Sequence, residues 1–335
     1  MSDPLLADLL AQGVTGVQGA VGLAELTTLK VGGPARVLVT AQRDADLAAV
    51  VAAARRHQVP FTVLGRGSNL LVADTGWPGI VVQLGRGFRG VDARGPRVRV
   101  GAAEPLPALA VRLADLGYDG FAWACSVPGT LGGAVRMNAG AHGADMSDHL
   151  VEVEVFRLSS ATRELWPAAL LGLAYRTSEL PEDAVVLTAT LELAPGDPAQ
   201  VRAQIDRIRA WRRAHQPLNE PNCGSVFTNP PGDSAGRLID AAGCKGLRVG
   251  GAEVSHRHAN FIVTRPGATA TDVATVIARV IMAVSADAGV QLRPEVRRLG
   301  EVHEDLSLPV DRSAPPASVE GGAAATGVAD APGSP

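Results

Sequence analysis

Three glycine-rich segments in the first 140 residues constrain this chain most. They read Gly-Arg-Gly-Ser-Asn at 65–69, Ser-Val-Pro-Gly-Thr-Leu-Gly-Gly-Ala at 126–134 and Thr-Leu-Lys-Val-Gly-Gly-Pro-Ala at 28–35. Glycine tolerates positive φ and has no side chain, so backbone amides there can converge on a phosphate. One such segment alone is equally consistent with a tight turn between strands. Three together indicate a large phosphorylated cofactor.

The first segment does not fit a Rossmann dinucleotide site. An apolar run of strand type follows Asn69, whereas the Rossmann motif requires a helix directly after its glycines. A nicotinamide-binding Rossmann domain is therefore disfavoured.

Charge and cysteine content exclude several classes of protein. The chain has 31 Lys and Arg against 34 Asp and Glu, a net charge of −3, without the basic excess of a nucleic-acid or membrane-surface binder. Its three cysteines form no Cys-x-x-Cys pair, so we expect neither a disulfide framework nor a metal site. The N-terminus lacks basic residues, and no apolar run reaches the ~18 residues of a membrane span. We expect a cytoplasmic monomer that inserts into no membrane and binds no nucleic acid.

Helix-type and strand-type segments alternate along the chain, which predicts an α+β or α/β fold. Helices are expected at 44–57, 105–117, 197–215, 234–242 and 272–288, and strands at 36–40, 61–64, 69–73, 97–100, 151–158, 185–193, 249–254, 260–264 and 291–299. A domain boundary is expected near 195, where Asp197-Pro198 begins a second region, and a further split near 80. From 306 the sequence is rich in Ala, Pro, Gly and Ser, as in a disordered tail.

Longer motifs in the chain resemble a known family. The segments LGRGSNLLVADTG (64–76) and SVPGTLGGAVRMNAGAHG (126–143) are followed by Ala-Tyr-Arg-Thr-Ser at 174–178, Cys-Gly-Ser-Val-Phe-Thr-Asn-Pro at 223–230 and Leu-Arg-Pro-Glu-Val at 292–296. Together they are similar to the UDP-N-acetylenolpyruvoylglucosamine reductases, members of the vanillyl-alcohol-oxidase-type flavoproteins. The glycine loops alone indicate only that superfamily, and the later motifs are specific to the reductases.

This resemblance implies an α+β fold with two FAD-binding subdomains, at 1–80 and 81–195, a smaller α+β substrate-binding domain at 196–305, and the tail at 306–335. It implies an NADPH-dependent flavoenzyme that reduces a UDP-sugar, UDP-N-acetylglucosamine enolpyruvate, to UDP-N-acetylmuramate in peptidoglycan synthesis. FAD and NADPH are the expected cofactors.

The resemblance also implies roles for individual residues. Arg176 and Glu295 take the positions that stabilise the reaction intermediate, and Ser225 takes that of the proton donor. Tyr175 and Asn229 are expected to bind substrate. The expected cofactor-binding residues all lie in or beside the first two glycine-rich segments: Gly65, Arg66, Gly67, Ser68, Asn69, Ser126, Gly129, Thr130, Gly132, Gly133 and Asn138.

Two departures from the family pattern concern the substrate diphosphate. Thr228 stands where the family often has Lys, so one phosphate contact is missing. Only six residues separate Ser178 from Val185, which leaves no room for the insertion whose Tyr covers the diphosphate in some members. The chain therefore resembles the shorter variant of the family.

Other interpretations remain open for the same residues. Taken singly, Ser225 is consistent with a turn residue, Arg176 with a surface arginine, and Glu295 with a partner of Arg297 on one strand face. An oxidase or dehydrogenase of the same superfamily, acting on a small alcohol or hydroxy acid, would keep the FAD loops without these residues. A catalytically inactive FAD-binding module is a third reading.

Overall fold

A computed structural model of the chain describes residues 3–312. The chain divides into two compact units. The first unit comprises Met1–Gly22, Pro34–Gly67 and Gly76–Trp211, and the second comprises Leu23–Gly33, Ser68–Thr75 and Arg212–Pro335. Two short segments, Leu23–Gly33 and Ser68–Thr75, thus belong to the second unit although the first unit surrounds them in sequence.

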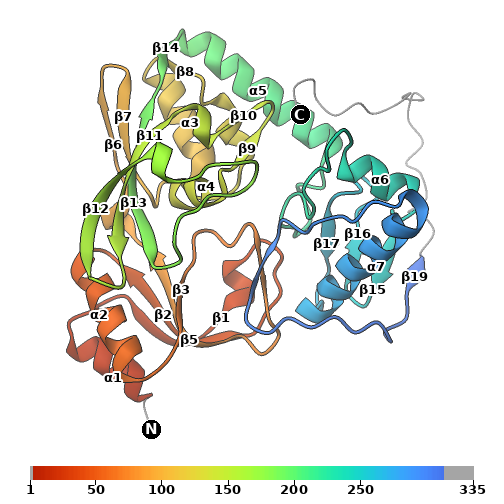
Figure 1. The fold of residues 1–335 in the computed structure, drawn as a ribbon, viewed down its shortest axis with the longest axis horizontal. Helices are drawn as coiled ribbons and strands as arrows, with labels where there is room; N and C mark the ends of the chain where they lie inside the picture. Colours follow the sequence, from red (N-terminus) through yellow and green to blue (C-terminus); the bar gives the residue numbers. More distant parts are fainter. Residues whose placement is uncertain (1–2, 313–335) are drawn as a thin grey trace. The chain divides into compact units, whose positions relative to one another are not determined.

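The first unit begins with a mixed four-stranded sheet in the order β1-β2-β5-β3 (Figure 1). Strands β2 (Pro34–Ala41) and β3 (Phe61–Val63) run parallel to β5 (Trp77–Leu84), and β1 (Val17–Gly22) runs antiparallel to β2. Helices α1 (Pro4–Ala11) and α2 (Asp44–Arg56) bury Leu5, Leu9, Leu47 and Val50 in one apolar cluster with Ile80 of β5. The parallel pairing of β2 and β5 places the loops at their carboxyl ends on one edge of the sheet.

A second sheet completes the first unit. It is antiparallel, in the order β12-β11-β13-β7-β6, with strands Thr162–Pro167, Leu150–Arg157, Ala184–Glu192, Arg97–Gly101 and Val91–Arg94. Helices α3 (Leu106–Asp115) and α4 (Leu131–Met137) and the first half of α5 (Pro198–His215) contribute side chains to its core. Short two-stranded pairings join β8 (Tyr118–Asp119) to β14 (Ala194–Pro195) and β9 (Gly140–Ala141) to β10 (Ala144–Asp145).

The second unit has an antiparallel sheet in the order β17-β16-β15-β19. Its strands are Ile262–Thr264, Ala252–Val254, Leu247–Val249 and Asp311–Arg312, and helices α6 (Ala235–Ala241) and α7 (Ala270–Ala288) supply much of its core. A separate parallel pair joins β4 (Leu70–Val72) to β18 (Arg297–Leu299). Gly32, at φ +111°, lies so close to Val72 that an added Cβ would be 2.5 Å from the Val72 Cβ. Gly32, in the glycine-rich segment at 28–35, therefore serves packing in this unit.

All five predicted helices and most of the predicted strands are present, shifted by a few residues. The strand expected at 249–254 is wrong in extent, because Gly250 and Gly251 form a turn between β15 and β16, with Gly250 at φ +52°. The strand expected at 291–299 is confined to Arg297–Leu299. Helices α1 and α4 and strands β1, β5, β6 and β12 were not predicted from the sequence.

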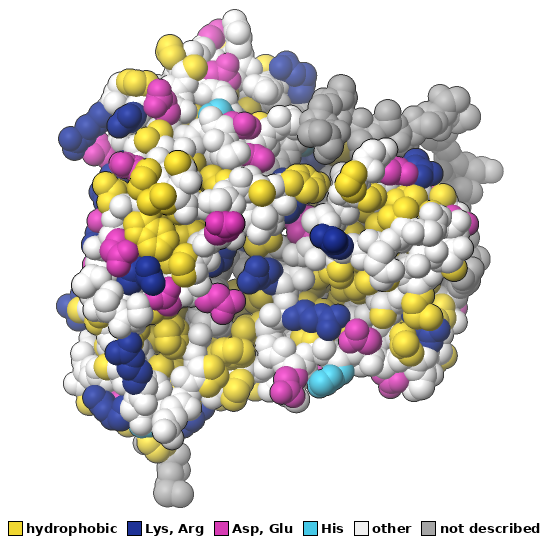
Figure 2. All heavy atoms as spheres, in the orientation of Figure 1, with side chains coloured by type: hydrophobic (Ala, Val, Ile, Leu, Met, Phe, Trp, Pro, Cys, Tyr) yellow, Lys and Arg dark blue, Asp and Glu magenta, His cyan; other side chains and the backbone are white. Residues whose placement is uncertain are grey.

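The expected tail at 306–335 falls mostly outside the described residues. In its described part, Asp311–Arg312 pairs with Leu247–Arg248 as β19. Among residues 3–312 no helix has the length and apolar character needed to cross a bilayer. On the face drawn in Figure 2, basic and acidic side chains are interspersed among apolar ones.

Candidate functional site

The first two glycine-rich segments come together in the first unit. A Cβ added to Gly65 would lie 2.9 Å from the side-chain oxygen of Thr130, so the first loop packs directly against the Thr130 side chain. The carbonyl oxygen of Gly65 also accepts a hydrogen bond from Gln83 Nε2 of β5, at 3.2 Å. A side chain at position 65 would separate the loops, which explains why glycine is needed there.

These touching loops present several uncommitted hydrogen-bond donors. Within residues 3–312, the backbone amides of Gly65, Arg66, Gly67, Gly129 and Thr130 donate to no protein acceptor. Gly67 has φ +59°, in the region that favours glycine. Neighbouring amides without an internal acceptor form an anion-binding concavity, as found around phosphates and diphosphates. The residues present therefore fit the diphosphate of FAD.

Other members of the expected cofactor set are engaged inside the protein. Thr130 caps α4 by accepting from the Gly133 amide at 3.4 Å, and Ser126 Oγ donates to the Trp123 carbonyl oxygen at 2.8 Å. Gly132 allows α4 to approach β7, since an added Cβ would lie 3.0 Å from the Ala102 Cβ. Asn138 is buried and bonded to two neighbouring segments.

Arg176 lies in a tight turn of the first unit. The amides and carbonyls of Ala174 and Thr177 exchange hydrogen bonds of 3.1 and 3.0 Å, so Tyr175 and Arg176 occupy the centre of the turn. Arg176 has φ +58° and its guanidinium lies 4.8 Å from the centre of the Tyr175 ring. Tyr175 is 47% exposed. The turn thus presents a stacked cation at the surface of this unit.

Ser225 and Glu295 are neighbours in the second unit. The Glu295 amide donates to the Val226 carbonyl oxygen at 2.7 Å, and the Thr228 amide donates to the Arg293 carbonyl oxygen at 3.0 Å. These bonds hold the two segments side by side, although they are far apart in sequence. Ser225 is exposed and Glu295 is partly buried. The structure therefore brings together two of the three predicted catalytic residues, while Arg176 belongs to the first unit.

Asn260 fixes the serine segment, a role that the sequence analysis did not assign. Its side-chain oxygen accepts from the Phe227 amide and its Nδ2 donates to the Phe227 carbonyl oxygen, both at 2.9 Å. Its own carbonyl oxygen accepts from the Val226 amide at 2.9 Å. A buried Asn must have such hydrogen-bond partners. The apolar neighbours Ala259 and Phe261 were the feature of the sequence that could have indicated this role for Asn260.

Asn69 holds the glutamate segment. Its Nδ2 donates to the Glu295 carbonyl oxygen at 3.2 Å, and its carbonyl oxygen accepts from the Arg297 amide at 3.1 Å. Asn69 and Ser68 belong to the second unit, whereas Gly65, Arg66 and Gly67 belong to the first. The Asn69 side chain therefore has a structural role that its place in the glycine-rich loop did not reveal.

Asn229 lies at the start of α6. Its Oδ1 accepts from the Ala235 amide at 3.0 Å, and within residues 3–312 its Nδ2 donates to no protein acceptor. Nearby, the bond from Arg237 lowers the pKa of Asp233 to about 2. Asn229 thus retains a donor for a ligand, near the ion pair that joins Asp233, just before α6, to Arg237 in its first turn.

Cys223 lies two residues before Ser225, in the same segment of the second unit. Burial raises the pKa of its thiol to about 12, and the charge of Glu295 adds to the effect. Because a thiol is reactive only as a thiolate, Cys223 is inert near neutral pH. The described residues include no group of three or more His, Cys, Asp or Glu side chains placed to hold a metal ion.

Comparisons with known proteins cover both units. Residues 35–162 match the model of the FAD binding domain, and residues 216–299 match that of the UDP-N-acetylenolpyruvoylglucosamine reductase C-terminal domain. The reductase of Gloeobacter violaceus is 46% identical over 288 residues, which is 85% of this chain and 96% of that protein. The chain belongs to the UDP-N-acetylenolpyruvoylglucosamine reductase family.

Further relatives agree with this assignment. The UDP-N-acetylenolpyruvoylglucosamine reductase of Anaeromyxobacter is 46% identical over 85% of this chain and 89% of its own. The solved structure of the reductase from Thermus caldophilus is 38% identical and superposes with a TM-score of 0.73, covering 84% of this chain and 98% of that one. The predicted family, the α+β fold of an FAD-binding region followed by the reductase C-terminal domain, and the class of FAD-dependent oxidoreductase are confirmed.

Proposed function

We propose that this protein reduces UDP-N-acetylglucosamine enolpyruvate to UDP-N-acetylmuramate, with NADPH as electron donor, in peptidoglycan synthesis. The observation that carries this proposal is the 2.7 Å bond from the Glu295 amide to the Val226 carbonyl oxygen, which sets the segment of Glu295 beside the segment of Ser225. A chain that needed only to bind FAD would have no reason to bring these two segments together. The high identity to named reductases supports the same conclusion.

FAD, when bound, supplies the two-electron transfer between NADPH and the substrate that no amino acid can perform. The backbone amides of Gly65, Arg66, Gly67, Gly129 and Thr130 would hold its diphosphate. Ser68 follows them in the chain and would add a hydroxyl donor. Gly132 and Gly133 would keep the space around the diphosphate free of side chains. Ser126 would order the loop before α4 through its bond to the Trp123 carbonyl oxygen.

We assign Arg176 to the negative charge that develops on the substrate carboxylate as the substrate is reduced. A guanidinium is planar, permanently charged and able to donate two parallel hydrogen bonds to a carboxylate. A preorganised donor aimed at developing charge is worth about 3–4 kcal/mol of barrier. Tyr175, stacked on the guanidinium, limits the positions that Arg176 can take and adds a surface for substrate.

We assign Ser225 as the donor of the proton that completes the reduction. A hydroxyl is a weak acid, so it can protonate only a strongly basic carbon over a short, fixed distance. The Asn260 side chain bonds to both the amide and the carbonyl oxygen of Phe227, two residues after Ser225, which supports such a fixed position. Ser225 is exposed on its unit, as a residue that must reach substrate requires.

Glu295 needs to be protonated, or paired with a cation, because a bare carboxylate would repel a developing anion. We propose the protonated form, which would donate a hydrogen bond to the intermediate. Infrared difference spectra of the complex with a non-reactive substrate analogue would test this. A carboxylate band for Glu295 at pH 7, identified by its loss in Glu295→Gln, would contradict the protonated form.

Substrate contacts follow from the remaining positions. Among the described residues Asn229 Nδ2 has no acceptor, and such a donor suits a phosphate or sugar oxygen. Thr228 is held to the Arg293 carbonyl oxygen by both its amide and its hydroxyl, so it does not replace the missing Lys. Weaker substrate binding after Asn229→Ala, seen as a raised KM with kcat preserved, is the expected result. An unchanged KM would remove Asn229 from the substrate site.

We also propose a cytoplasmic monomer, with the chain organised as FAD-binding segments 1–80 and 81–195, a substrate-binding domain at 196–305 and a tail from 306. Sedimentation of the purified full chain tests the monomer directly, and a mass of twice 34.5 kDa would contradict it. Membrane fractionation of cells that produce the protein tests its location.

One spectroscopic experiment tests the function as a whole. Flavin bands that bleach when NADPH is added anaerobically, and return on adding UDP-N-acetylglucosamine enolpyruvate, would establish cofactor, donor and acceptor together. Flavin bands that NADPH leaves unchanged, combined with oxidation of a small alcohol or hydroxy acid, would favour an oxidase of the same superfamily. A protein that takes up FAD but performs neither reaction would favour an inactive binding module.

A further inference from the structure

Asn138 has every polar atom of its side chain engaged. It is 1% exposed and ends α4 in the left-handed conformation, at φ +39°. Its Nδ2 donates to the Ala174 carbonyl oxygen at 3.0 Å and to Asp145 Oδ2 at 3.3 Å, and its Oδ1 accepts from the Ser147 amide at 3.0 Å. An Asn side chain with both kinds of group in use has little capacity left for a ligand.

The bond to Ala174 reaches the residue that opens the Arg176 turn. Ala174 is also the residue whose amide and carbonyl close that turn with Thr177. Arg176 adopts φ +58°, a conformation that L side chains rarely take unless the surroundings hold it. Asn138 therefore fixes the entry of a strained turn.

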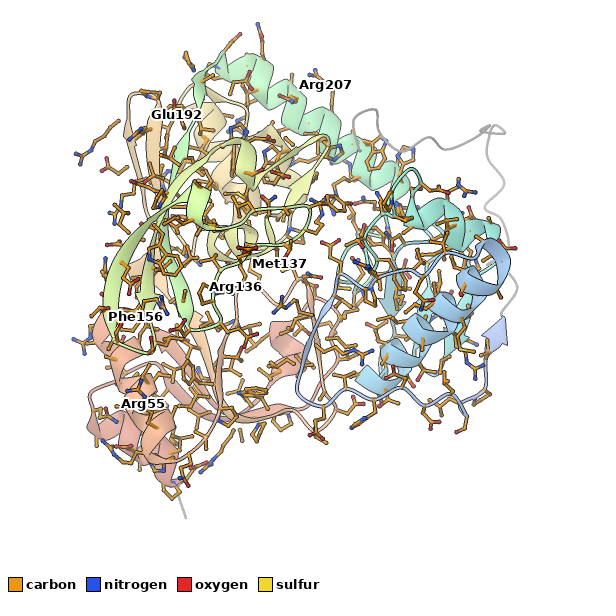
Figure 3. The ribbon with its side chains drawn as sticks, in the orientation of Figure 1. Arg55, Arg136, Met137, Phe156, Glu192 and Arg207 are labelled. Atoms are coloured by element: carbon orange, nitrogen blue, oxygen red, sulfur yellow. The ribbon has the colours of Figure 1, made fainter. Side chains whose placement is uncertain are left out.

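The same end of α4 fixes the exit of the turn. The Arg136 carbonyl oxygen accepts from Ser178 Oγ at 2.7 Å. The Arg136 guanidinium donates to the carbonyl oxygens of Leu180, Pro181 and Ala184 at 3.1, 3.1 and 2.5 Å. Arg136 and Met137, labelled in Figure 3, mark this end of the helix. The segment around Arg176 is thus tied to α4 on both sides.

We propose that Asn138 is a positioning residue for Arg176 and not a ligand of the cofactor. The inference rests on the proposed function, in which Arg176 meets the charge on the substrate carboxylate. Thr130, in the loop that fits a diphosphate, caps the start of α4, and Asn138 caps its end. One short helix therefore links the cofactor loop to the turn that carries Arg176, within a single unit.

The test uses Asn138→Gly in the full-length, FAD-loaded protein. Glycine tolerates the left-handed conformation, so this change removes the side-chain bonds without adding backbone strain. We expect the flavin content and the rate of flavin reduction by NADPH to stay within about twofold of wild type, whereas flavin reoxidation by the enolpyruvyl substrate slows by roughly tenfold or more. Asn219→Gly is the matched control, because Asn219 is exposed and its side chain makes no hydrogen bond within the described chain.

A double-mutant comparison distinguishes a positioning role of Asn138 from a general loss of structure. In Arg176→Lys, reoxidation is already slow, and adding Asn138→Gly should slow it by no more than about twofold, since both changes affect the same interaction. Independent effects would multiply instead, and that result would overturn the proposal. Asn138→Asp serves as a second variant: it keeps the acceptor for Ser147 but sets a carboxylate against Asp145 and the Ala174 carbonyl oxygen, so it should slow reoxidation at least as much as Asn138→Gly.

The remaining outcomes are also decisive. Loss of FAD or of a folded protein in both Asn138 variants would overturn the positioning role, as would reoxidation at the wild-type rate. If the wild-type flavin itself is not reoxidised by the enolpyruvyl substrate, the proposed function fails first, and the two failures are distinguished by that single measurement.

Discussion

The side-chain amide of Asn69 donates a hydrogen bond to the backbone carbonyl oxygen of Glu295 at 3.2 Å, across 226 residues of sequence. Together with the bond from the Arg297 amide to the Asn69 carbonyl oxygen, it fixes the segment that carries Glu295, directly before β18. A residue that the motif assigns to the cofactor thus controls the backbone of a residue assigned to substrate chemistry.

Asn69→Ala is expected to slow flavin reoxidation by substrate more than flavin reduction by NADPH. The variant loses one partly buried hydrogen bond, about 1 kcal/mol of stability, so it should fold. Stopped-flow measurement of the two half-reactions checks this, with Asn219→Ala as control. Equal slowing of both half-reactions would show that Asn69 acts through the cofactor.

Asn260→Ala should destabilise the protein strongly. It leaves the buried amide and carbonyl of Phe227 without partners, at a cost of about 1–3 kcal/mol for each group. Asn260→Asp keeps the acceptor but sets a buried carboxylate against the Phe227 carbonyl oxygen, so at pH 7 it should destabilise the protein at least as much as Asn260→Ala. Urea unfolding of both variants gives the comparison, and a stability of either variant within about 0.5 kcal/mol of wild type would contradict the role of Asn260.

Ser225→Ala should reduce turnover by roughly 10²–10⁴-fold, the usual value of a positioned proton donor. Because Ser225 is exposed, its removal should change stability by less than about 0.5 kcal/mol. Flavin reduction by NADPH should be unaffected. Turnover within a few-fold of wild type would remove Ser225 from the proposed role.

Gly65→Ala should weaken FAD retention, because the new Cβ would lie 2.9 Å from Thr130 Oγ1 and separate the two loops. Gly22→Ala is the control, since Gly22 lies at the end of β1, outside both loops, and its added Cβ would meet no atom within 4 Å. The ratio of flavin to protein after gel filtration measures the difference. Equal retention in the two variants would mean that the loop contact does not shape the cofactor site.

Stability should fall as the pH rises above 9, in part through Cys223. Its pKa is about 12 in the folded protein against 9.0 for an ordinary thiol, so between these values the unfolded chain loses a proton that the folded chain keeps. The contribution of the protonated Cys223 thiol to the free energy of unfolding is fully present below pH 9. Above pH 9 it declines by at most about 1.4 kcal/mol for each pH unit. Urea midpoints at pH 8 and 10 should differ less in Cys223→Ala than in the wild type.

Local sequence signals predicted helices well. Helix α7 starts two residues earlier than expected because Thr269 caps it, with its side-chain oxygen accepting from the Asp272 amide at 3.0 Å, and it stops at Gly289 as predicted. Such caps and stops lie within a few residues of the helix that they limit. The two glycine loops of the cofactor site were found for the same reason.

Partners that are distant in sequence could not be predicted. Nothing in Leu70–Val72 specifies Arg297–Leu299 as its neighbour, and the short strands of the second unit have too few residues for a period to appear. The motifs identified Arg176, Ser225 and Glu295 as candidates. The asparagines that fix the backbone near these residues are Asn69, Asn138 and Asn260, and their roles follow only from their hydrogen-bond partners in the structure.

The pairing of β4 with β18 also bears on how the protein is made. Synthesis proceeds at about 5–20 residues per second. During translation the residues of β4 are synthesised early, whereas those of its parallel partner β18 follow only after most of the chain has been made. Until then Leu71 and Val72, which are fully buried in the finished protein, lack the strand that pairs with them. The nascent chain therefore carries an exposed apolar edge for many seconds, and a chaperone that shields such an edge would have its binding site here.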